Sequence, residues 1–151
     1  MAELVVFIGL PGSGKTTFYE RMFADTHFHI SKDRMPNNRR PERRQQQLAT
    51  DALQQGRSVV IDNTNPSVAS RAALLEIGRA HGATLIAYFF NTPKVECVRR
   101  NHRRAGKARV PDVAIYVSAS KLRPPQPEEA FDEVYYVTPA ENREMTITRT
   151  G

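Results

Sequence analysis

Short continuous apolar runs alternate with longer stretches of helical periodicity along this chain. The runs at 4–8, 28–30, 58–61, 84–90 and 134–137 predict strands, and 145–148 is a candidate edge strand. Continuous apolar runs, as opposed to alternating ones, are typical of parallel strands that are covered on both faces. Helices are predicted at 15–24, 41–55, 66–81, from Pro93 onward, and from 111 or 112 to about 122. This alternation predicts an α/β fold with a mainly parallel central sheet and helices on both faces.

The spacing of apolar residues assigns a core-facing side to each of the first three helices. Residues three or four positions apart share one helix face. The predicted positions are Phe18, Met22 and Phe23 in the first helix, Leu48, Ala52 and Gln55 in the second, and Val68, Ala72 and Leu75 in the third.

A glycine-rich loop joins the first predicted strand to the first predicted helix. Residues 9–16 read G-L-P-G-S-G-K-T and match the phosphate-loop pattern G-x-x-x-x-G-K-[ST] in its required context. Loop amides and the helix N-terminus would cradle a polyphosphate, with Lys15 on the β- and γ-phosphates and the Thr16 hydroxyl on Mg²⁺. The alternative is a glycine-rich turn that binds nothing. The predicted triphosphate contacts are Gly12, Ser13, Gly14, Lys15, Thr16 and Thr17.

Polar residues follow several predicted strands directly. Gly9, Asp33, Asp62 and Asn91 each come just after one, and ligands of parallel α/β sheets bind beyond the carboxyl ends of the strands. A carboxylate at Asp33 could accept a proton from a hydroxyl that attacks the γ-phosphate. The alternative roles for Asp33 are a helix cap or a partner for nearby arginines.

The run Asp62-Asn63-Thr64-Asn65 ends the third predicted strand. Its carboxylate, hydroxyl and amides suit the orientation of Mg²⁺, of metal-bound water or of an acceptor. The alternative is an Asx-turn that caps the next helix. No Glu follows Asp62, which disfavours a motor-type ATPase that activates water for hydrolysis alone.

Basic residues are concentrated in the segment 94–109, which holds seven of them and one acidic residue. Arg100 and Arg104 are four residues apart and share a helix face. Directed at the phosphates, they would neutralise the charge that develops during transfer. The alternative is a solvated basic face in which Glu96 pairs with Arg100. The segment 34–44 carries five more arginines and begins as a predicted loop.

Composition narrows the class of protein further. The 151 residues carry 22 Lys and Arg against 16 Asp and Glu, a net charge of +6, which favours an anionic partner. One cysteine, Cys97, excludes an internal disulfide and is predicted to pack inside. No apolar run approaches the roughly 20 residues that cross a membrane. We expect a single domain over 1–151, cytoplasmic, with no membrane partner and with its four histidines in ordinary packing or exposure.

Taken together, these residues resemble the 5′-hydroxyl polynucleotide kinase domain of phage, bacterial and animal nucleic-acid repair enzymes. The resemblance runs from the N-terminus to about Val137. Its markers are G-L-P-G-S-G-K-T-T at 9–17, Asp33, V-V-I-D-N-T-N-P at 59–66 and R-R-N-H-R-R-A-G-K-A-R-V-P at 99–111. It implies a P-loop kinase fold with an arginine-rich lid, ATP and Mg²⁺ as cofactors, and 5′-OH ends of nucleic acid as partners.

The resemblance also implies roles for individual residues. Asp33 falls at the general base for the 5′-OH, and Arg104 falls at the lid arginine on the ATP phosphates, with Arg100 one turn earlier. Val110 falls at an apolar lid residue against the terminal base; its alternative role is a hydrophobic staple before a helix. The acceptor-side residues are Asp33, Asp62, Thr64, Asn65, Arg71 and Val110, and the catalytic ones are Lys15, Asp33 and Arg104.

One position departs from the family pattern. Pro36 stands where the phage enzyme has an arginine that holds an acceptor phosphate, and Arg34 and Arg39 are the candidates to replace it. The leading hypothesis is Mg²⁺-assisted transfer of the ATP γ-phosphate to the 5′-OH of DNA or RNA. The alternatives are a small-molecule kinase that acts on a nucleoside, sugar or nucleotide sugar, and a nucleotide-dependent nucleic-acid-binding module without transfer.

Overall fold

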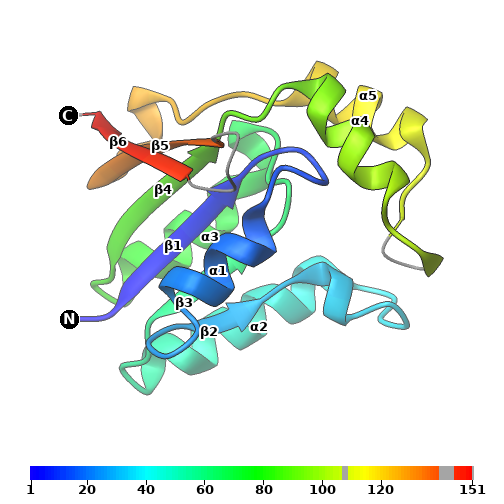
Figure 1. Cartoon of the computed structure of the whole chain (residues 1–151). Helices are drawn as coiled ribbons and strands as arrows, with labels where there is room; N and C mark the ends of the chain where they lie inside the picture. Colours follow the sequence, from blue (N-terminus) through cyan, green and yellow to red (C-terminus); the bar gives the residue numbers. More distant parts are fainter. Residues whose placement is uncertain (107–108, 140–144, 151) are drawn as a thin grey trace.

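A twisted central sheet separates two layers of helices in the computed structural model (Figure 1). The structure describes residues 1–106, 109–139 and 145–150. Its strands are β1 (Glu3–Ile8), β2 (Phe28–Ile30), β3 (Val59–Asp62), β4 (Thr84–Phe90), β5 (Glu133–Pro139) and β6 (Met145–Thr150). They lie in the order β2-β3-β1-β4-β5-β6. Neighbouring strands from β2 to β5 are parallel, and β6 runs antiparallel to β5. The predicted mainly parallel sheet is confirmed.

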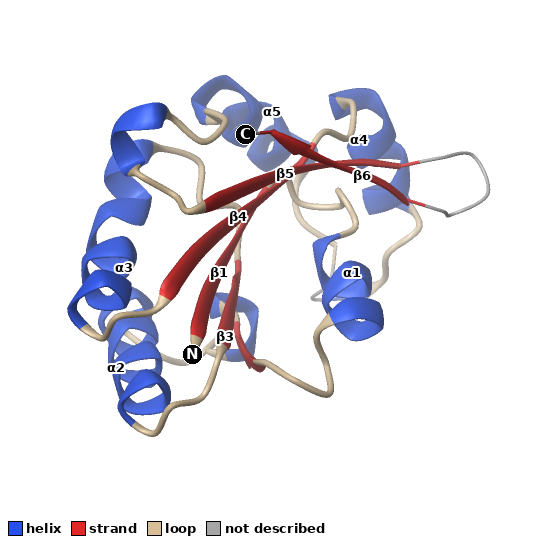
Figure 2. Ribbon diagram, turned by 90° about the vertical axis from the view of Figure 1, so that its left-hand side faces the viewer, coloured by secondary structure: helices blue, strands red, loops and turns tan. Residues whose placement is uncertain are grey.

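Helices cover both faces of this sheet, as predicted. They are α1 (Lys15–Met22), α2 (Pro41–Gln54), α3 (Val68–Ala80), α4 (Lys94–His102) and α5 (Asp112–Lys121), with short 3₁₀ turns η1 (Lys32–Arg34) and η3 (Pro127–Glu129). Figure 2 shows α2 and α3 on one face of the sheet and α1 on the other. In the part of the chain that the structure describes, no helix is both long and apolar enough to span a membrane.

The central strand β1 divides the core into two halves. Leu4, Val6 and Ile8 point to one face and pack with buried residues of α2 and α3, such as Leu53 and Leu74. Val5 and Phe7 point to the other face and pack with α1, where edge-on aromatic contacts join Phe7 to Phe18 and Phe90. Because side chains alternate along a strand, a run that is apolar on both faces places β1 at the centre of the molecule.

Three residues on the predicted helix faces are exposed. Met22 is 53% exposed, and Gln55 and Ala72 are exposed as well. In α1 the buried side chains are Lys15, Phe18 and Tyr19. In α3 the buried residues are Arg71, Leu74, Leu75 and Gly78, so Leu75 is buried as predicted and Arg71 is buried in place of Ala72. This difference in α3 arises because Arg71 is buried in an ion pair with Glu129. A search for apolar residues at helical spacing does not identify a buried arginine.

The carboxyl ends of β1, β2 and β3 meet at one edge of the sheet. Phe7 of β1 lies beside Asp62 of β3, and Ile30 of β2 lies beside Ile61. The glycine-rich loop, η1 and the 62–65 loop therefore start from neighbouring points. Helices α4 and α5 lie on the same side (Figure 1) and pack over a small cluster of Leu10, Cys97 and Ile115.

Candidate functional site

The glycine-rich loop after β1 needs glycine for two reasons. Gly12 and Gly14 have positive φ angles of 82° and 100°, which residues with a side chain rarely adopt. A Cβ at Gly12 would also lie 2.9 Å from the carbonyl oxygen of Cys97. The loop therefore rests directly on the backbone of α4.

Two side chains from the β4–α4 region hold this loop in place. The Thr92 hydroxyl donates to the carbonyl of Ser13 at 2.9 Å, and Nη1 of Arg100 donates to the carbonyl of Gly12 at 3.3 Å. Nε of Arg100 also lies 3.1 Å from Oε1 of Glu96. Arg100 thus makes the ion pair of the alternative interpretation and reaches the loop at the same time.

Lys15 is folded back onto its own loop. Its Nζ donates to the carbonyls of Gly9 at 2.9 Å and Leu10 at 2.8 Å, and the residue is only 9% exposed. Burial lowers the pKa of this ammonium to about 8, and the nearby Asp62 carboxylate opposes that shift. Phosphate oxygens would replace these carbonyls as acceptors, so the loop fits a polyphosphate.

Asp62 lies at the centre of a small polar cluster. Its Oδ2 accepts from the Thr16 hydroxyl at 2.9 Å and lies 2.8 Å from Nε2 of His29. Mg²⁺ is usually held by one or two protein oxygens together with substrate phosphates and water. A hydroxyl beside a carboxylate fits that donor set. Among the described residues no group of three or more His, Cys, Asp or Glu could hold a metal by itself. Thr17 is exposed next to Thr16.

Asp33 lies in η1, exposed at the end of β2. The cap of this turn is Ser31, whose hydroxyl accepts from the Asp33 amide at 3.3 Å, and within the described residues the Asp33 carboxylate forms no ion pair with an arginine. Asn63 fixes the turn to the end of β3, because its Oδ1 accepts from the Lys32 amide at 2.9 Å. The negative charge of Asp33 also acts to raise the pKa of Lys15. Neither alternative role of Asp33 is observed.

Asn65 and Thr64 bond the 62–65 loop to the end of β1 and to the residue that follows it. The Asn65 side chain is buried and donates to the carbonyl of Phe7 at 2.7 Å, and its φ of 46° is left-handed. The carbonyl of Thr64 accepts from the Gly9 amide at 3.1 Å. These bonds tie the 62–65 loop to the start of the glycine-rich loop. The cap of α3 is Ser67, paired with Ser70, so the 62–65 run does not cap this helix, which was its alternative role.

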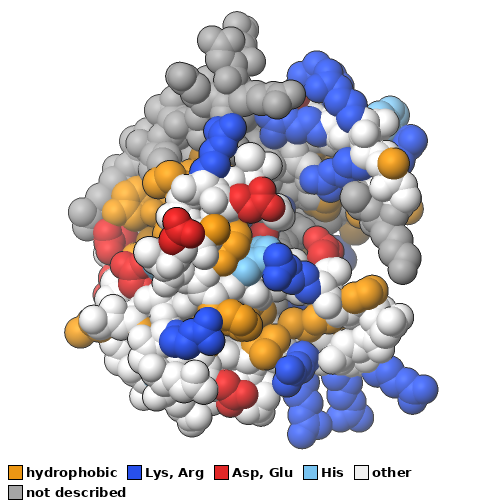
Figure 3. Space-filling view, turned by 60° about the horizontal axis from the view of Figure 1, so that its bottom comes forward, with side chains coloured by type: hydrophobic (Ala, Val, Ile, Leu, Met, Phe, Trp, Pro, Cys, Tyr) orange, Lys and Arg blue, Asp and Glu red, His pale blue; other side chains and the backbone are white. Residues whose placement is uncertain are grey.

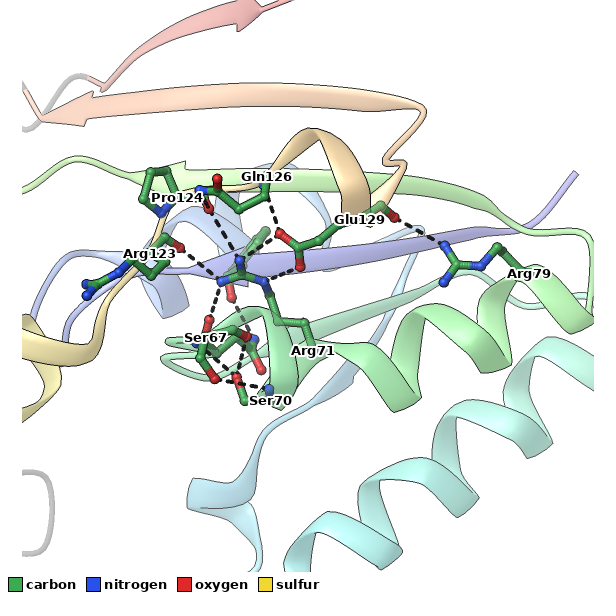
Figure 4. A network of polar contacts seen from close by, with 10 residues as sticks. Ser67, Ser70, Arg71, Arg79, Arg123, Pro124, Gln126 and Glu129 are labelled. Atoms are coloured by element: carbon green, nitrogen blue, oxygen red, sulfur yellow. Dashed lines mark hydrogen bonds and ion pairs between the residues drawn. The ribbon is translucent and has the colours of Figure 1, made fainter.

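Arg71 lies inside the molecule, where a bound substrate cannot reach its side chain. It is 0% exposed, and its Nε and Nη2 each lie 2.7 Å from an oxygen of Glu129. Its Nη1 donates to the carbonyls of Asn65 at 2.8 Å and Arg123 at 3.0 Å (Figure 4). The expectation that Arg71 binds substrate is wrong. Glu129 neutralises the buried charge of Arg71, and Arg71 in turn holds the 62–65 loop through the Asn65 carbonyl.

The predicted lid is described only in part, since Lys107 and Ala108 lie outside the described residues. Arg104 is exposed just after α4, and its charge helps to lower the pKa of Lys15, so it lies near the loop. Val110 is half-buried and packs on the cluster that contains Ile115. Pro111 caps α5, so Val110 and Ile115 occupy the positions of a hydrophobic staple, the alternative role considered for Val110.

One site residue, His29, escaped prediction, and Asn63 has a role other than the predicted one. His29 stacks on Tyr19 with ring centroids 4.1 Å apart and contacts Asp62, while its buried Nδ1 has no hydrogen-bond partner among the described residues. Asn63 links η1 to β3. The only signal for His29 was its place on β2 near the strand end, and that signal does not reveal a contact with a residue 33 positions away.

Comparison with known proteins places this geometry in a family. A model of the family described as AAA domain matches residues 4–125, which include the glycine-rich loop, η1, the 62–65 loop and α4. The chain belongs to the AAA domain family. The predicted P-loop therefore lies within a family model that spans most of the chain.

Two relatives found by sequence comparison are polynucleotide phosphatase/kinases. The chain is 31% identical over 143 residues to a bifunctional polynucleotide phosphatase/kinase of Acanthamoeba polyphaga mimivirus. The aligned region covers 90% of this chain and 33% of the relative. It spans about a third of the length of the phosphatase/kinases that it matches.

Solved structures of kinases share the fold. A fungal RNA kinase has a TM-score of 0.69 at 18% identity, over 90% of this chain and 74% of that one. A sugar kinase from Janibacter sp. HTCC2649 has the same TM-score at 17% identity, over 91% and 86% of the two chains. These likenesses establish a P-loop kinase fold for the AAA domain described here.

Proposed function

We propose that the protein is a polynucleotide 5′-hydroxyl kinase that transfers the γ-phosphate of ATP to the 5′-OH end of DNA or RNA. Two kinds of support favour this function. Two of the sequence relatives are polynucleotide phosphatase/kinases. The carboxyl edge of the sheet also carries a phosphate loop and, beside it, the exposed carboxylate of Asp33, which has no ion pair among the described residues.

The donor side of the reaction uses groups that are already in place. ATP would enter the loop with its phosphates on the backbone amides, and the Lys15 ammonium would exchange the carbonyls of Gly9 and Leu10 for phosphate oxygens. Arg100 and Arg104 would offset negative charge on the transferred group. Mg²⁺, held by Thr16 and through water by Asp62, would supply further neutralisation of the phosphates.

The acceptor side depends on Asp33. Its carboxylate would accept the proton of the 5′-OH as that oxygen bonds to the γ-phosphorus and the bond to ADP breaks. The observation that carries this proposal is the position of Asp33: it is exposed, has no ion pair within the described residues, is held to β3 through Asn63 and is close enough to act on the charge of Lys15.

The test is transfer of labelled γ-phosphate from ATP with Mg²⁺ to matched acceptors. The panel contains 5′-OH and 5′-phosphate oligonucleotides of DNA and RNA, free nucleosides and sugars. We expect label on 5′-OH oligonucleotides only. Asp33→Asn should lower kcat about 10²- to 10⁴-fold. The matched control is Asp132→Asn, because the Asp132 carboxylate accepts from the Leu85 amide at the start of β4, the end opposite the glycine-rich loop. A change within a few-fold for Asp33→Asn would exclude Asp33 as the base.

A second candidate function is a small-molecule kinase, favoured by the shared fold of the sugar kinase. Label on nucleosides or sugars alone would establish it. Binding of ATP and oligonucleotide with no acceptor labelled would instead indicate a nucleic-acid-binding module without transfer.

A further inference from the structure

A hydroxyl, an imidazole and a carboxylate are joined in series at the end of the sheet opposite the glycine-rich loop. Oγ1 of Thr26 lies 2.7 Å from Nδ1 of His27, and Nε2 of the same ring lies 2.7 Å from Oε1 of Glu3. Thr26 and His27 belong to the segment between α1 and β2, and Glu3 is the first residue of β1. The two contacts use both nitrogens of one ring, and we call the three residues the Thr26–His27–Glu3 relay.

The partners of His27 determine which of its nitrogens carries the proton. At neutral pH a glutamate carboxylate can only accept, so Nε2 of the neutral ring holds the hydrogen and donates it to Glu3. Nδ1 then offers its lone pair to the Thr26 hydroxyl. A hydroxyl bonded to an imidazole whose second nitrogen is held by a carboxylate is the arrangement that activates nucleophiles in covalent catalysis.

The His27 ring is held in one position by its surroundings. The His27 amide donates to the carbonyl of Phe23 at 2.9 Å, and the His27 carbonyl accepts from the Tyr19 hydroxyl at 2.6 Å. The ring also packs edge-on against Phe23, with centroids 4.8 Å apart. The His27 side chain is only 9% exposed, whereas Thr26 is exposed. The base is therefore fixed and shielded, and the hydroxyl is open to a reactant.

Stability of the fold accounts for only part of this arrangement. With the Glu3 side chain 36% exposed, its pairing with His27 contributes about 0–1 kcal/mol. That pairing needs no contribution from Thr26, whose exposed hydroxyl could bond to water instead. The contact between Thr26 and the imidazole adds little to stability, but it gives the hydroxyl a base.

Thr26 and His27 line an open pocket of about 430 Å³ between the segments that precede β2 and β3 (Figure 1). Its other charged side chains are Asp25 and Arg57. The Arg57 guanidinium lies 4.9 Å from the centre of the Phe28 ring, and in the part of the chain that the structure describes no ion pair joins Arg57 to a carboxylate. A guanidinium of this kind can hold a phosphate group through two hydrogen bonds.

This pocket is remote from the candidate phosphate site. Its residues precede β2 and β3, and Glu3 begins β1, whereas the glycine-rich loop, η1 and the 62–65 loop follow these strands. Figure 3 keeps the left and right of Figure 1, and most Lys and Arg side chains on its visible face lie at the right, towards which β1 runs. A ligand beside Thr26 would therefore not compete with a nucleotide in the glycine-rich loop.

We propose that Thr26 is a nucleophile that takes the acyl group of a small acyl phosphate, with His27 as its general base and Glu3 as the positioning residue. Oγ1 of Thr26 bonds to the carbonyl carbon and gives its proton to Nδ1 of His27, while the bond from that carbon to the phosphate oxygen breaks. The proton then passes to the leaving phosphate. The products are an ester on Thr26 and inorganic phosphate, which Arg57 holds. This reaction uses no ATP and is independent of the proposed kinase activity.

The experiment incubates the full chain with acetyl phosphate or with p-nitrophenyl acetate and maps acetylated peptides over time by mass spectrometry. Ser58 is the internal control, because it lines the same pocket and its Oγ contacts the Glu3 amide instead of an imidazole. The variants are Thr26→Val, Thr26→Ser, and His27→Ala with and without added imidazole. Thermal melts show that each variant is folded.

We expect acetylation of Thr26 to be at least about 10²-fold faster than that of Ser58, because a general base contributes about 10²- to 10⁴-fold. Thr26→Ser should keep the fast reaction, and Thr26→Val should remove the rapid release of p-nitrophenolate. His27→Ala should lose the rate advantage, and free imidazole should restore part of it. Glu3→Leu should slow the reaction, and Glu3→Asp should recover part of that loss.

Two results would overturn the relay: equal rates at Thr26 and Ser58 in the wild type, or an unchanged rate in His27→Ala. Arg57→Gln tests the class of donor. It should slow the reaction with acetyl phosphate about 10-fold or more, as expected for a lost hydrogen bond to a charged group, and leave the reaction with neutral p-nitrophenyl acetate unchanged. An equal effect on both donors would overturn the assignment of an acyl phosphate.

Discussion

Nε2 of His29 lies 2.8 Å from Oδ2 of Asp62, the same oxygen that accepts the Thr16 hydroxyl at 2.9 Å. The side chains of His29 and Asp62 are both almost fully buried, and His29 is stacked on Tyr19. This contact fixes the rotamer of the carboxylate that we assign to the Mg²⁺ shell. His29 is therefore a positioning residue that acts through Asp62.

We predict that His29→Ala lowers transfer and raises the Mg²⁺ concentration needed for half-maximal rate, by about 10- to 100-fold, as for other groups that orient a metal's ligands. His29→Gln should recover part of this loss, because its amide can donate to Asp62. His81→Ala is the control, since His81 is exposed at the end of α3. An unchanged Mg²⁺ dependence in His29→Ala would contradict the role.

The buried ammonium of Lys15 predicts how ATP binding depends on pH. Its pKa is about 8 in the free protein, and phosphate charges beside it would raise that pKa in the complex. ATP binding therefore takes up a proton above pH 8, and affinity should fall towards tenfold per pH unit there. Isothermal titration in buffers of different ionisation enthalpy measures this uptake. In Lys15→Arg the charge cannot be lost, so the decline above pH 8 should disappear.

The same lysine limits the stability of the free protein. Its pKa is lowered from 10.5 to about 8 on folding, so the unfolded chain binds more protons between these values and the free energy of unfolding rises with pH from about 8 to 10.5. Below pH 8 the full penalty remains. Lys15→Met should raise the free energy of unfolding at pH 7 by about 1–3 kcal/mol and abolish ATP binding. Denaturant melts at pH 7 and pH 10 should show the difference between variant and wild type shrinking at the higher pH.

The Arg71–Glu129 pair predicts a large loss of stability when one partner is removed. Arg71→Met leaves a buried carboxylate without its cation, which costs about 3–5 kcal/mol. The double variant Arg71→Met/Glu129→Met should recover much of that loss, as no unpaired charge remains. Arg99→Met, in the exposed pair with Glu96, should change stability little. Equal destabilisation by the single and double variants in urea melts would show that the carbonyl contacts of Arg71 matter more than the pair.

The strands and the phosphate loop were predictable because their signals are local. The β1 run, the glycines with Lys15, and the polar residues after β2 and β3 are each contained in a few neighbouring positions. The rule that parallel strands end at one edge then brings Asp33 and Asp62 near the loop without any knowledge of contacts.

The parts that were missed depend on partners far along the chain. Arg71 is buried because Glu129, 58 residues later, is buried with it, and no helical pattern shows such a pairing. That pair also moved the apolar stripe of α3 away from Ala72. His29 was read as ordinary packing because its contact with Asp62 exists only once β2 lies beside β3.

The contact between Gly12 and the backbone of Cys97 has a consequence for the cost of binding a donor. With the loop seated on α4, and Thr92 and Arg100 bonded to its carbonyls, its conformational entropy is lost during folding and not when a nucleotide arrives. Little ordering is then left to oppose association, and in the proposed reaction Arg100, already bonded to the Gly12 carbonyl, would reach the phosphates without a large movement. The donor half of the site is thereby preorganised.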